Sequence, residues 1–235
     1  MNPQTTNPLA TTHPSIVRQL VVKDLRIMGV FTLFWWLLGV GSIVLTMFGG
    51  ESMAMPSFIL FLTALGGAAI HLVMSTVVEE RREKTLAFVM SLPVTIREYT
   101  TAKVAFNLGL FGLVWLSLSA ASFVVFIGDE GLPDGSIPFV VVMFVTILVA
   151  FVLILSISLV TESIGWAIGA AAGANISSQI FLWWIVSLPG ISSVIRGPVP
   201  VWNATVLTIL GCLVGTALLL LIGTYWVQGR KTEFV

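Results

Sequence analysis

The ionisable residues of the chain gather in one stretch, Val78–Lys103, which begins with six consecutive charged residues at 79–84. At a bilayer centre each would oppose insertion by about 2.5–3.5 kcal/mol, so the stretch must lie in water or at the head groups. The following residues, 85–92, place apolar side chains at helical spacing before Pro93 ends the segment. A solvated loop that anchors the span ends is the simpler interpretation. An amphipathic helix, however, needs lipid or a protein to cover it, which predicts a docking surface.

Other residue types offer little for catalysis. The sequence has no G-x-x-x-x-G-K-[ST] phosphate loop, no G-x-S-x-G elbow and no H-E-x-x-H pair. Its two histidines, His13 and His71, and its single Cys212 make a metal site or a disulfide framework hard to assemble. His71 falls in an apolar segment, where a ligand or proton-relay role competes with a simple interhelical hydrogen bond. We expect neither a nucleotide site nor an enzyme active site in this chain.

A second polar group interrupts the apolar run at 165–188. Small residues recur every four positions, which allows close approach of two helix backbones, and amide and hydroxyl groups near mid-span need partners. Two interpretations stay open: ordinary packing within one subunit, or a packing seam between subunits or polar stripe along a pathway. The residues concerned are Gly165, Gly169, Gly173, Asn175, Ser177, Ser178 and Gln179.

The composition identifies the elements that must position these groups. Of 235 residues, 57% are hydrophobic and 9% charged, against about 25% charged in soluble domains. The zero net charge argues against a nucleic-acid partner. The chain is therefore predicted to be an all-α polytopic membrane protein with six spans. We place them at about 30–48, 56–78, 105–127, 137–160, 165–188 and 203–227.

The segments outside the spans complete the prediction of a single transmembrane domain at 15–235. Residues 1–14 have the composition of a flexible tail. Residues 16–28 form either an amphipathic interfacial helix or a polar lead-in to the first span. Ten Lys and Arg residues fall in the N-terminal segment, the 79–103 loop and the C-terminus, against Arg196 alone opposite, which predicts cytoplasmic termini. The apolar loop 189–200 is a candidate re-entrant hairpin.

The charged stretch resembles a pattern of type-2 ATP-binding-cassette (ABC) exporter permeases, E-x-x-x-G-T-L-E-x-L-L-x-x-P-V-[ST]-x-x-E-x-x-x-x-K. The chain departs from it at Lys84, where the family usually has Gly, and at Ala87, where it often has an acid. The pattern covers about a tenth of the chain, while the six spans and the N-terminal helix extend the resemblance less specifically. The matching residues are Glu80, Thr85, Leu86, Val89, Met90, Pro93, Val94, Thr95, Glu98 and Lys103.

The resemblance implies an export permease in the inner membrane of a bacterium or archaeon. Two permeases would pair, and separate ATPase subunits would bind ATP and Mg²⁺. The second and fifth spans would line part of the pathway, with Asn175, Ser178 and Gln179 facing it. The loop would be a coupling helix on the ATPase, through Glu80, Glu83, Thr85, Leu86, Val89, Met90, Leu92 and Pro93.

Two other classes of function are alternatives to an export permease. A non-transporting assembly or immunity protein would bind its target in the bilayer and would not need an ATPase. An intramembrane enzyme would need a nucleophile with a base, or a metal set, which the sequence does not offer. The exporter interpretation accounts best for a docking loop in a chain that lacks a phosphate loop.

Overall fold

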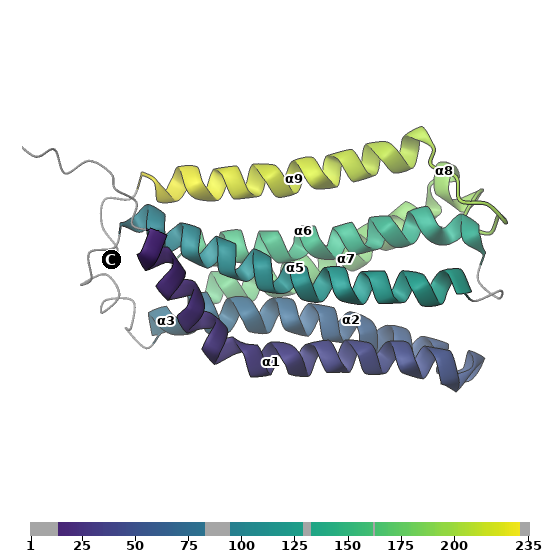
Figure 1. Ribbon diagram of the computed structural model, residues 1–235. Helices are drawn as coiled ribbons and strands as arrows, with labels where there is room; N and C mark the ends of the chain where they lie inside the picture. The colour runs from purple at the N-terminus through teal and green to yellow at the C-terminus, as the bar shows by residue number, and fades with distance from the viewer. Residues whose placement is uncertain (1–13, 83–94, 129–132, 162, 231–235) are drawn as a thin grey trace, which may run out of the picture.

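The computed structural model describes residues 14–82, 95–128, 133–161 and 163–230, and in these ranges it contains helices and no strand. The all-α prediction is confirmed. The long helices lie side by side in one bundle (Figure 1). They are α1 (Pro14–Gly49), α2 (Glu51–Val73), α5 (Ile96–Gly128), α6 (Ile137–Thr161), α7 (Ile164–Ser187) and α9 (Ala204–Gln228).

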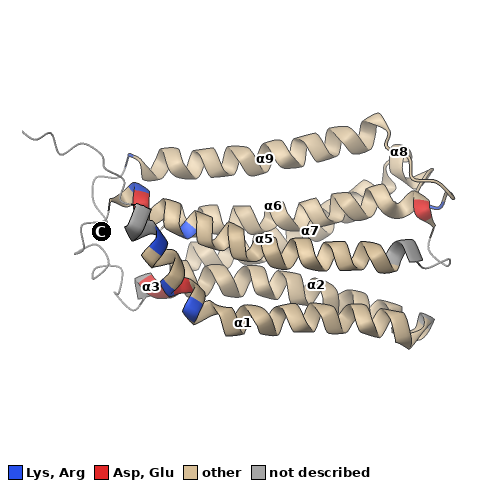
Figure 2. Ribbon diagram, viewed as in Figure 1, with Lys and Arg blue, Asp and Glu red and all other residues tan. Residues whose placement is uncertain are grey.

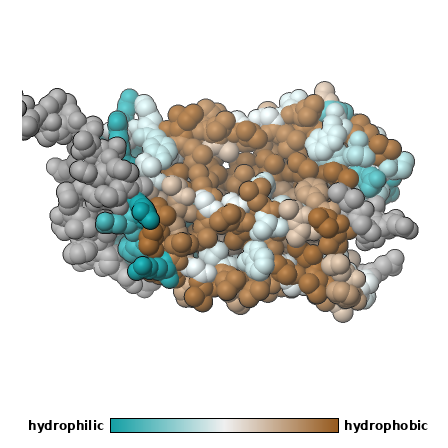
Figure 3. Space-filling model, in the orientation of Figure 1, coloured by the Kyte–Doolittle hydropathy of each residue, from teal (hydrophilic) through white to brown (hydrophobic). Residues whose placement is uncertain are grey.

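Within the described residues, five helical segments are long and apolar enough to cross a membrane, and they cover all or most of α1, α2, α5, α6 and α9. Their outward faces carry many exposed large apolar side chains, which form the brown band of Figure 3. Such a surface fits lipid better than water. Helix α7 is also 24 residues long, but its mid-helix polar residues lower its hydropathy, and it is not among the five.

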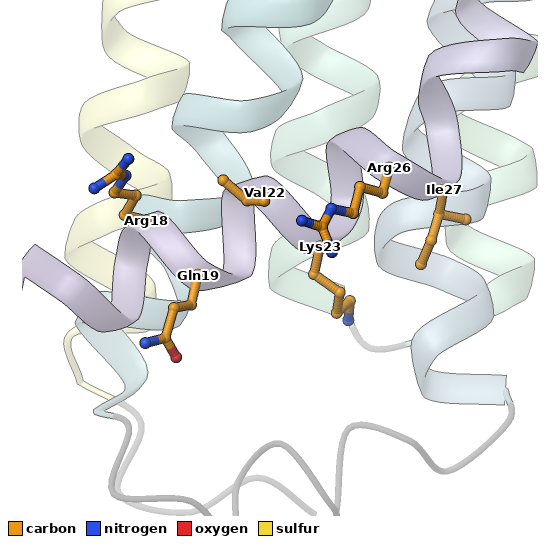
Figure 4. Close-up of a pocket in the computed structure, with 6 residues that line it drawn as sticks. All are labelled: Arg18, Gln19, Val22, Lys23, Arg26 and Ile27. Carbon is orange, nitrogen blue, oxygen red and sulfur yellow. The ribbon is translucent and has the colours of Figure 1, made fainter.

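The N-terminal segment differs from the expectation of a separate interfacial helix. Residues 14–49 form one continuous helix, and its first part runs at an angle to the rest (Figure 1). The close-up places the change of direction near Ile27 (Figure 4). Gly29 follows shortly after in the sequence, and glycine weakens a helix locally. The amphipathic part and the first span are thus joined without a loop.

Helix α6 lies at the centre of the packing and contacts α9 and α7 most extensively, then α2 and α5. Phe111 of α5 stacks on Phe151 of α6 with ring centroids 4.0 Å apart. The indole of Trp115 donates a hydrogen bond to the Phe144 carbonyl at 2.9 Å. Helix α1 covers the other side, packing against α2 and α5. Apolar contacts therefore account for most of the packing between the long helices in the middle of the bundle.

Short elements mark the two ends of the bundle. At the end that carries Pro14, Glu80 and Gln228, here called the charged end, α2 continues into the π-helix η1 (Met74–Val78) and then α3 (Glu79–Arg82). At the opposite end, here called the hairpin end, lie the 3-10 helix η2 (Asp134–Ser136) and α8 (Pro189–Ser192). Gly50, with φ of 63°, turns α1 into α2. Figure 2 shows most described charges at the charged end.

Candidate functional site

Of the segment 80–93, which contains the predicted ATPase contacts, the structure describes only the beginning, residues 80–82. Of the predicted ATPase contacts, Glu80 alone lies there, and its residue is 9% exposed. It therefore faces the interior of the charged end. The other predicted contacts lie outside the described residues: Glu83, Thr85, Leu86, Val89, Met90, Leu92 and Pro93.

Four charged side chains, Lys23, Asp24, Glu80 and Lys103, form a closed network at the charged end, here called the ion cluster. Lys23 Nζ lies 2.6 Å from Glu80 Oε1 and 3.6 Å from Asp24 Oδ1. Lys103 Nζ lies 2.7 Å from Asp24 Oδ2 and 2.9 Å from Glu80 Oε2. The Tyr99 hydroxyl donates to Glu80 Oε2 at 3.2 Å. The cluster joins α1, α3 and α5, which are distant in the sequence.

Burial determines the energetics of the ion cluster. The Lys103 side chain is 1% exposed, whereas that of Lys23 is 43% exposed. Burial by itself raises the pKa of the Glu80 carboxyl, but the nearby ammonium groups of Lys103 and Lys23 outweigh it and hold that pKa below its ordinary value. Two positive and two negative groups balance. Because desolvation offsets much of the attraction, we interpret the cluster mainly as a device that fixes how three helices meet.

A capping box fixes the point where the chain re-enters the bundle at α5. The Thr95 backbone N–H donates to Glu98 Oε2 at 2.9 Å, and the Glu98 N–H donates to Thr95 Oγ1 at 3.2 Å. This reciprocal pair satisfies two donors that a helix start leaves unpaired. The V-[ST]-x-x-E part of the sequence pattern is thus a helix start, and it lets α5 begin well before the apolar run.

The ion cluster continues into a buried polar contact with the π-helix. Asn107, fully buried on α5, donates to Thr76 Oγ1 at 3.0 Å and to the Lys103 carbonyl at 2.9 Å. Thr76 belongs to η1, and π-helical turns occur frequently at functional sites. The segment that leads to the docking loop is therefore held to α5 at two levels, by Glu80 and by Thr76.

Sequence reasoning found some members of this site and missed others. Glu80 and Lys103 stand at the two ends of the matched pattern, and the structure brings them into contact. Lys23 and Asp24 belong to the segment 16–28, for which the sequence predicts an amphipathic helix or a polar lead-in but no ion pair. The sequence did carry a signal for the pair of Glu80 and Lys103, since opposite charges at the two ends of a loop can form an ion pair. The spacing did not indicate that α1 would supply the other two charges.

The polar residues of α7 lie on the outside of the chain. Asn175, Ser177 and Gln179 are exposed and Ser178 is partly buried. A Cβ added at Gly169 or Gly173 would meet nothing within 4 Å, and one at Gly165 would meet only Ser163 Oγ at 3.7 Å. Within the described chain, these glycines therefore leave open space where a helix backbone could approach.

Helices α2, α6 and α7 surround a narrow cavity of about 80 Å³ beside these polar residues. Asn175, Ser178 and Gln179 line it from α7, and Gly66 and Ala69 are among the small residues that line it from α2. The structure thus brings the second and fifth predicted spans to one cavity, across α6. The amide and hydroxyl groups of α7 thus line one side of a small, mainly apolar cavity.

His71 lies among aromatic rings of α1. Its ring centroid is 5.0 Å from that of Phe31 and 6.4 Å from that of Trp35. Its Nε2 atom is buried and has no hydrogen-bond partner among the described residues. The contacts are those of a packed ring between α1 and α2, and the expected interhelical hydrogen bond from Nε2 is not seen there.

An apolar helical bundle with most of its described charges at one end defines a multi-pass integral membrane protein. A model of the "ABC-2 family transporter protein" matches residues 19–232. The chain therefore belongs to the ABC-2 transporter family, as its resemblance predicted, and is the membrane component of an ABC transporter. Such components are transport subunits that associate with an ABC ATPase. No curated protein and no solved structure matches the chain significantly.

Proposed function

We propose that this chain is the permease of an ATP-driven exporter in the inner membrane of a bacterium or archaeon. A separate ATPase subunit binds ATP and Mg²⁺, and its closure displaces the coupling loop 79–103. The observation that carries the proposal is the ion cluster, which ties the start of this loop and the helix after it to α1 in a chain of the ABC-2 family. The chain itself performs no catalysis.

In this proposal α1, α2, α5, α6, α7 and α9 all cross the membrane, with the charged end in the cytoplasm. At 1.5 Å per residue, the 24 residues of α7 exceed a hydrocarbon core of about 30 Å. Helix α7 also packs extensively on α6. The basic residues gathered at the charged end favour the cytoplasm for that end (Figure 2).

The ion cluster offers a physical route for coupling. Lys103 sits within a continuous helix that runs from Ile96 to Gly128, and Asp24 sits within α1. A displacement of the loop would therefore act on two spans through short, buried contacts rather than through a flexible linker. Transmission of movement through rigid elements and packed contacts is the usual physical basis of such coupling.

The pathway is proposed to lie between two copies of the chain, beside α7 and α2. Exposed amides such as Asn175 and Gln179 would be costly against lipid tails. A second copy or a water-filled passage satisfies them. The open glycine positions Gly169 and Gly173 permit a close helix approach there. Together these features favour a dimer with a polar central path.

The coupling assignment is tested by co-expression of the chain with each ABC ATPase that its genome of origin encodes. The native chain should purify with the ATPase in detergent and raise its ATP turnover. Leu86→Asp and Met90→Asp place a carboxylate in the proposed apolar contact, so each should weaken the complex at least tenfold. Affinity purification and ATPase assays measure both effects.

Val199→Asp is the matched control, because it makes the same change at a residue 61% exposed at the hairpin end. It should leave the complex and the ATP turnover unchanged. Size-exclusion chromatography verifies that each variant folds. Folded Leu86→Asp and Met90→Asp chains that keep the complex and its stimulation would show that the loop is not the coupling element.

A further inference from the structure

The first part of α1 presents a basic face that the ion cluster does not use. Arg18 and Arg26 are both exposed, and Val22 lies between them along the helix (Figure 4). Eight positions correspond to about 12 Å along a helix axis. A hollow of about 630 Å³ lies against this face, which Arg18, Val22, Lys23 and Arg26 help to line.

These two arginines are available for a ligand. Among the described residues, no acidic side chain lies within ion-pair distance of Arg18 or Arg26. The two acidic members of the ion cluster pair with lysines instead: Asp24 contacts Lys103, and Glu80 contacts both Lys23 and Lys103. The face thus carries two positive charges that remain uncompensated within the described structure.

The same face joins directly to the lipid-facing surface of the first span. Leu25 is 47% exposed, Ile27 53% and Val30 75%, so apolar side chains flank and follow the arginines. In Figure 3 hydrophilic residues at the charged end border immediately on the apolar band. A ligand that fits must therefore be anionic at one end and apolar at the other, which favours a lipid over an acidic protein or a free ion.

We propose that Arg18 and Arg26 bind the phosphate head groups of anionic phospholipids, whose acyl chains run along Leu25, Ile27 and Val30. The proposal goes beyond the transport function and does not depend on it. Because Lys23 and Asp24 lie between the two arginines on the same helix, bound lipid would hold the α1 side of the ion cluster at the membrane surface.

Native mass spectrometry of the purified full-length chain tests this directly. The chain in detergent is offered equal amounts of phosphatidylglycerol and phosphatidylcholine, and the lipids retained are counted. The native chain should retain phosphatidylglycerol preferentially. Each of Arg18→Gln and Arg26→Gln should lower that preference roughly fivefold, and the double variant more than tenfold.

Two further variants separate charge at this face from charge in general. Arg18→Lys with Arg26→Lys keeps the charges and should keep most of the preference. Arg196→Gln removes an exposed arginine at the hairpin end and should change nothing. Size-exclusion chromatography verifies that each variant folds. If the double variant does not fold, the two single variants provide the test.

Four results would overturn the proposal. The native chain could retain both lipids equally, or the folded arginine variants could keep the full preference for phosphatidylglycerol. Inorganic phosphate at millimolar concentration could also displace the lipid completely, which would assign the face to a free anion. Loss of the ATPase complex in these variants with unchanged lipid retention would assign the face to the protein partner instead.

Discussion

The two ends of the bundle are closed by different chemistry. At the charged end, buried ionic side chains join α1, α3 and α5, with Lys103 contacting both Asp24 and Glu80. At the hairpin end, backbone and apolar contacts close the structure. The Gly135 N–H donates to the Gly197 carbonyl at 2.9 Å, and buried Ile191 belongs to an apolar cluster with residues of α6, α7 and α9.

This difference indicates which end is suited to move. An ionic contact depends on the charge of each partner and can be exchanged for another when helices shift by a small distance. The hairpin end leaves no such room, because a Cβ at Gly135 would lie 2.1 Å from the Val194 carbonyl oxygen. We therefore expect movement of the coupling loop to rearrange the charged end while the hairpin end keeps its geometry.

The largest effect is expected from Lys103→Met, which breaks the ionic closure. The change leaves the buried carboxylates of Asp24 and Glu80 with only the half-exposed Lys23 from the ion cluster, and loss of one partner of a buried pair costs about 3–5 kcal/mol. The free energy of unfolding, measured by denaturation in mixed micelles, should fall by that amount.

Lys23→Met is the matched control for this change. Lys23 contacts the same two carboxylates, but its side chain is 43% exposed, and exposed ion pairs contribute only about 1 kcal/mol or less. The loss should therefore be several-fold smaller than for Lys103→Met. Equal losses in the two variants would contradict the central position of Lys103.

A smaller effect is expected from Gly135→Ala at the hairpin end. The new methyl group would collide with backbone atoms of Val194 and Gly197, and overpacking of this kind costs about 1–3 kcal/mol. The control is Gly109→Ala on α5, whose added Cβ meets nothing within 4 Å and should be close to neutral. The same micelle denaturation measures both, and a neutral Gly135→Ala would show that the hairpin end can adjust.

The fold was largely predictable because apolar runs of bilayer length specify helices almost independently of their neighbours. The prediction was least accurate where polar residues extend a helix. The third span was predicted at about 105–127 with polar residues leading into it, whereas the structure joins these residues and the span in one helix, α5, from Ile96 to Gly128. The capping box and the buried partners of Lys103 make the helical conformation favourable there.

The candidate site was predictable only in part. Glu80 and Lys103 follow from a local pattern, but Asp24 is 79 positions away from Lys103, and one sequence does not specify which helices are neighbours. Composition likewise identified the polar residues of α7. Their outward orientation depends on how α7 rotates against α6, which packing determines and helical periodicity does not.

The smallest change in the free energy of unfolding is expected from titration of Glu80, and it should affect the charged end but not the hairpin end. In the folded chain, Lys103 and Lys23 hold the pKa of the Glu80 carboxyl below its ordinary value of 4.5. The ionised Glu80 therefore stabilises the fold above pH 4.5, and this contribution is lost as the pH falls through the lowered pKa.

The free-energy difference between the native chain and Glu80→Gln should therefore stay constant from neutral pH down to the ordinary carboxyl range and shrink as the pH falls further, through the lowered pKa of Glu80. The difference for Gly135→Ala should remain the same over that range, because no charge takes part in the contact it disturbs. Unfolding measurements of the three chains at each pH provide the check. A Glu80→Gln difference that did not shrink in acid would mean that the carboxylate is not held by Lys103 and Lys23, and the ionic closure of the charged end would have to be abandoned.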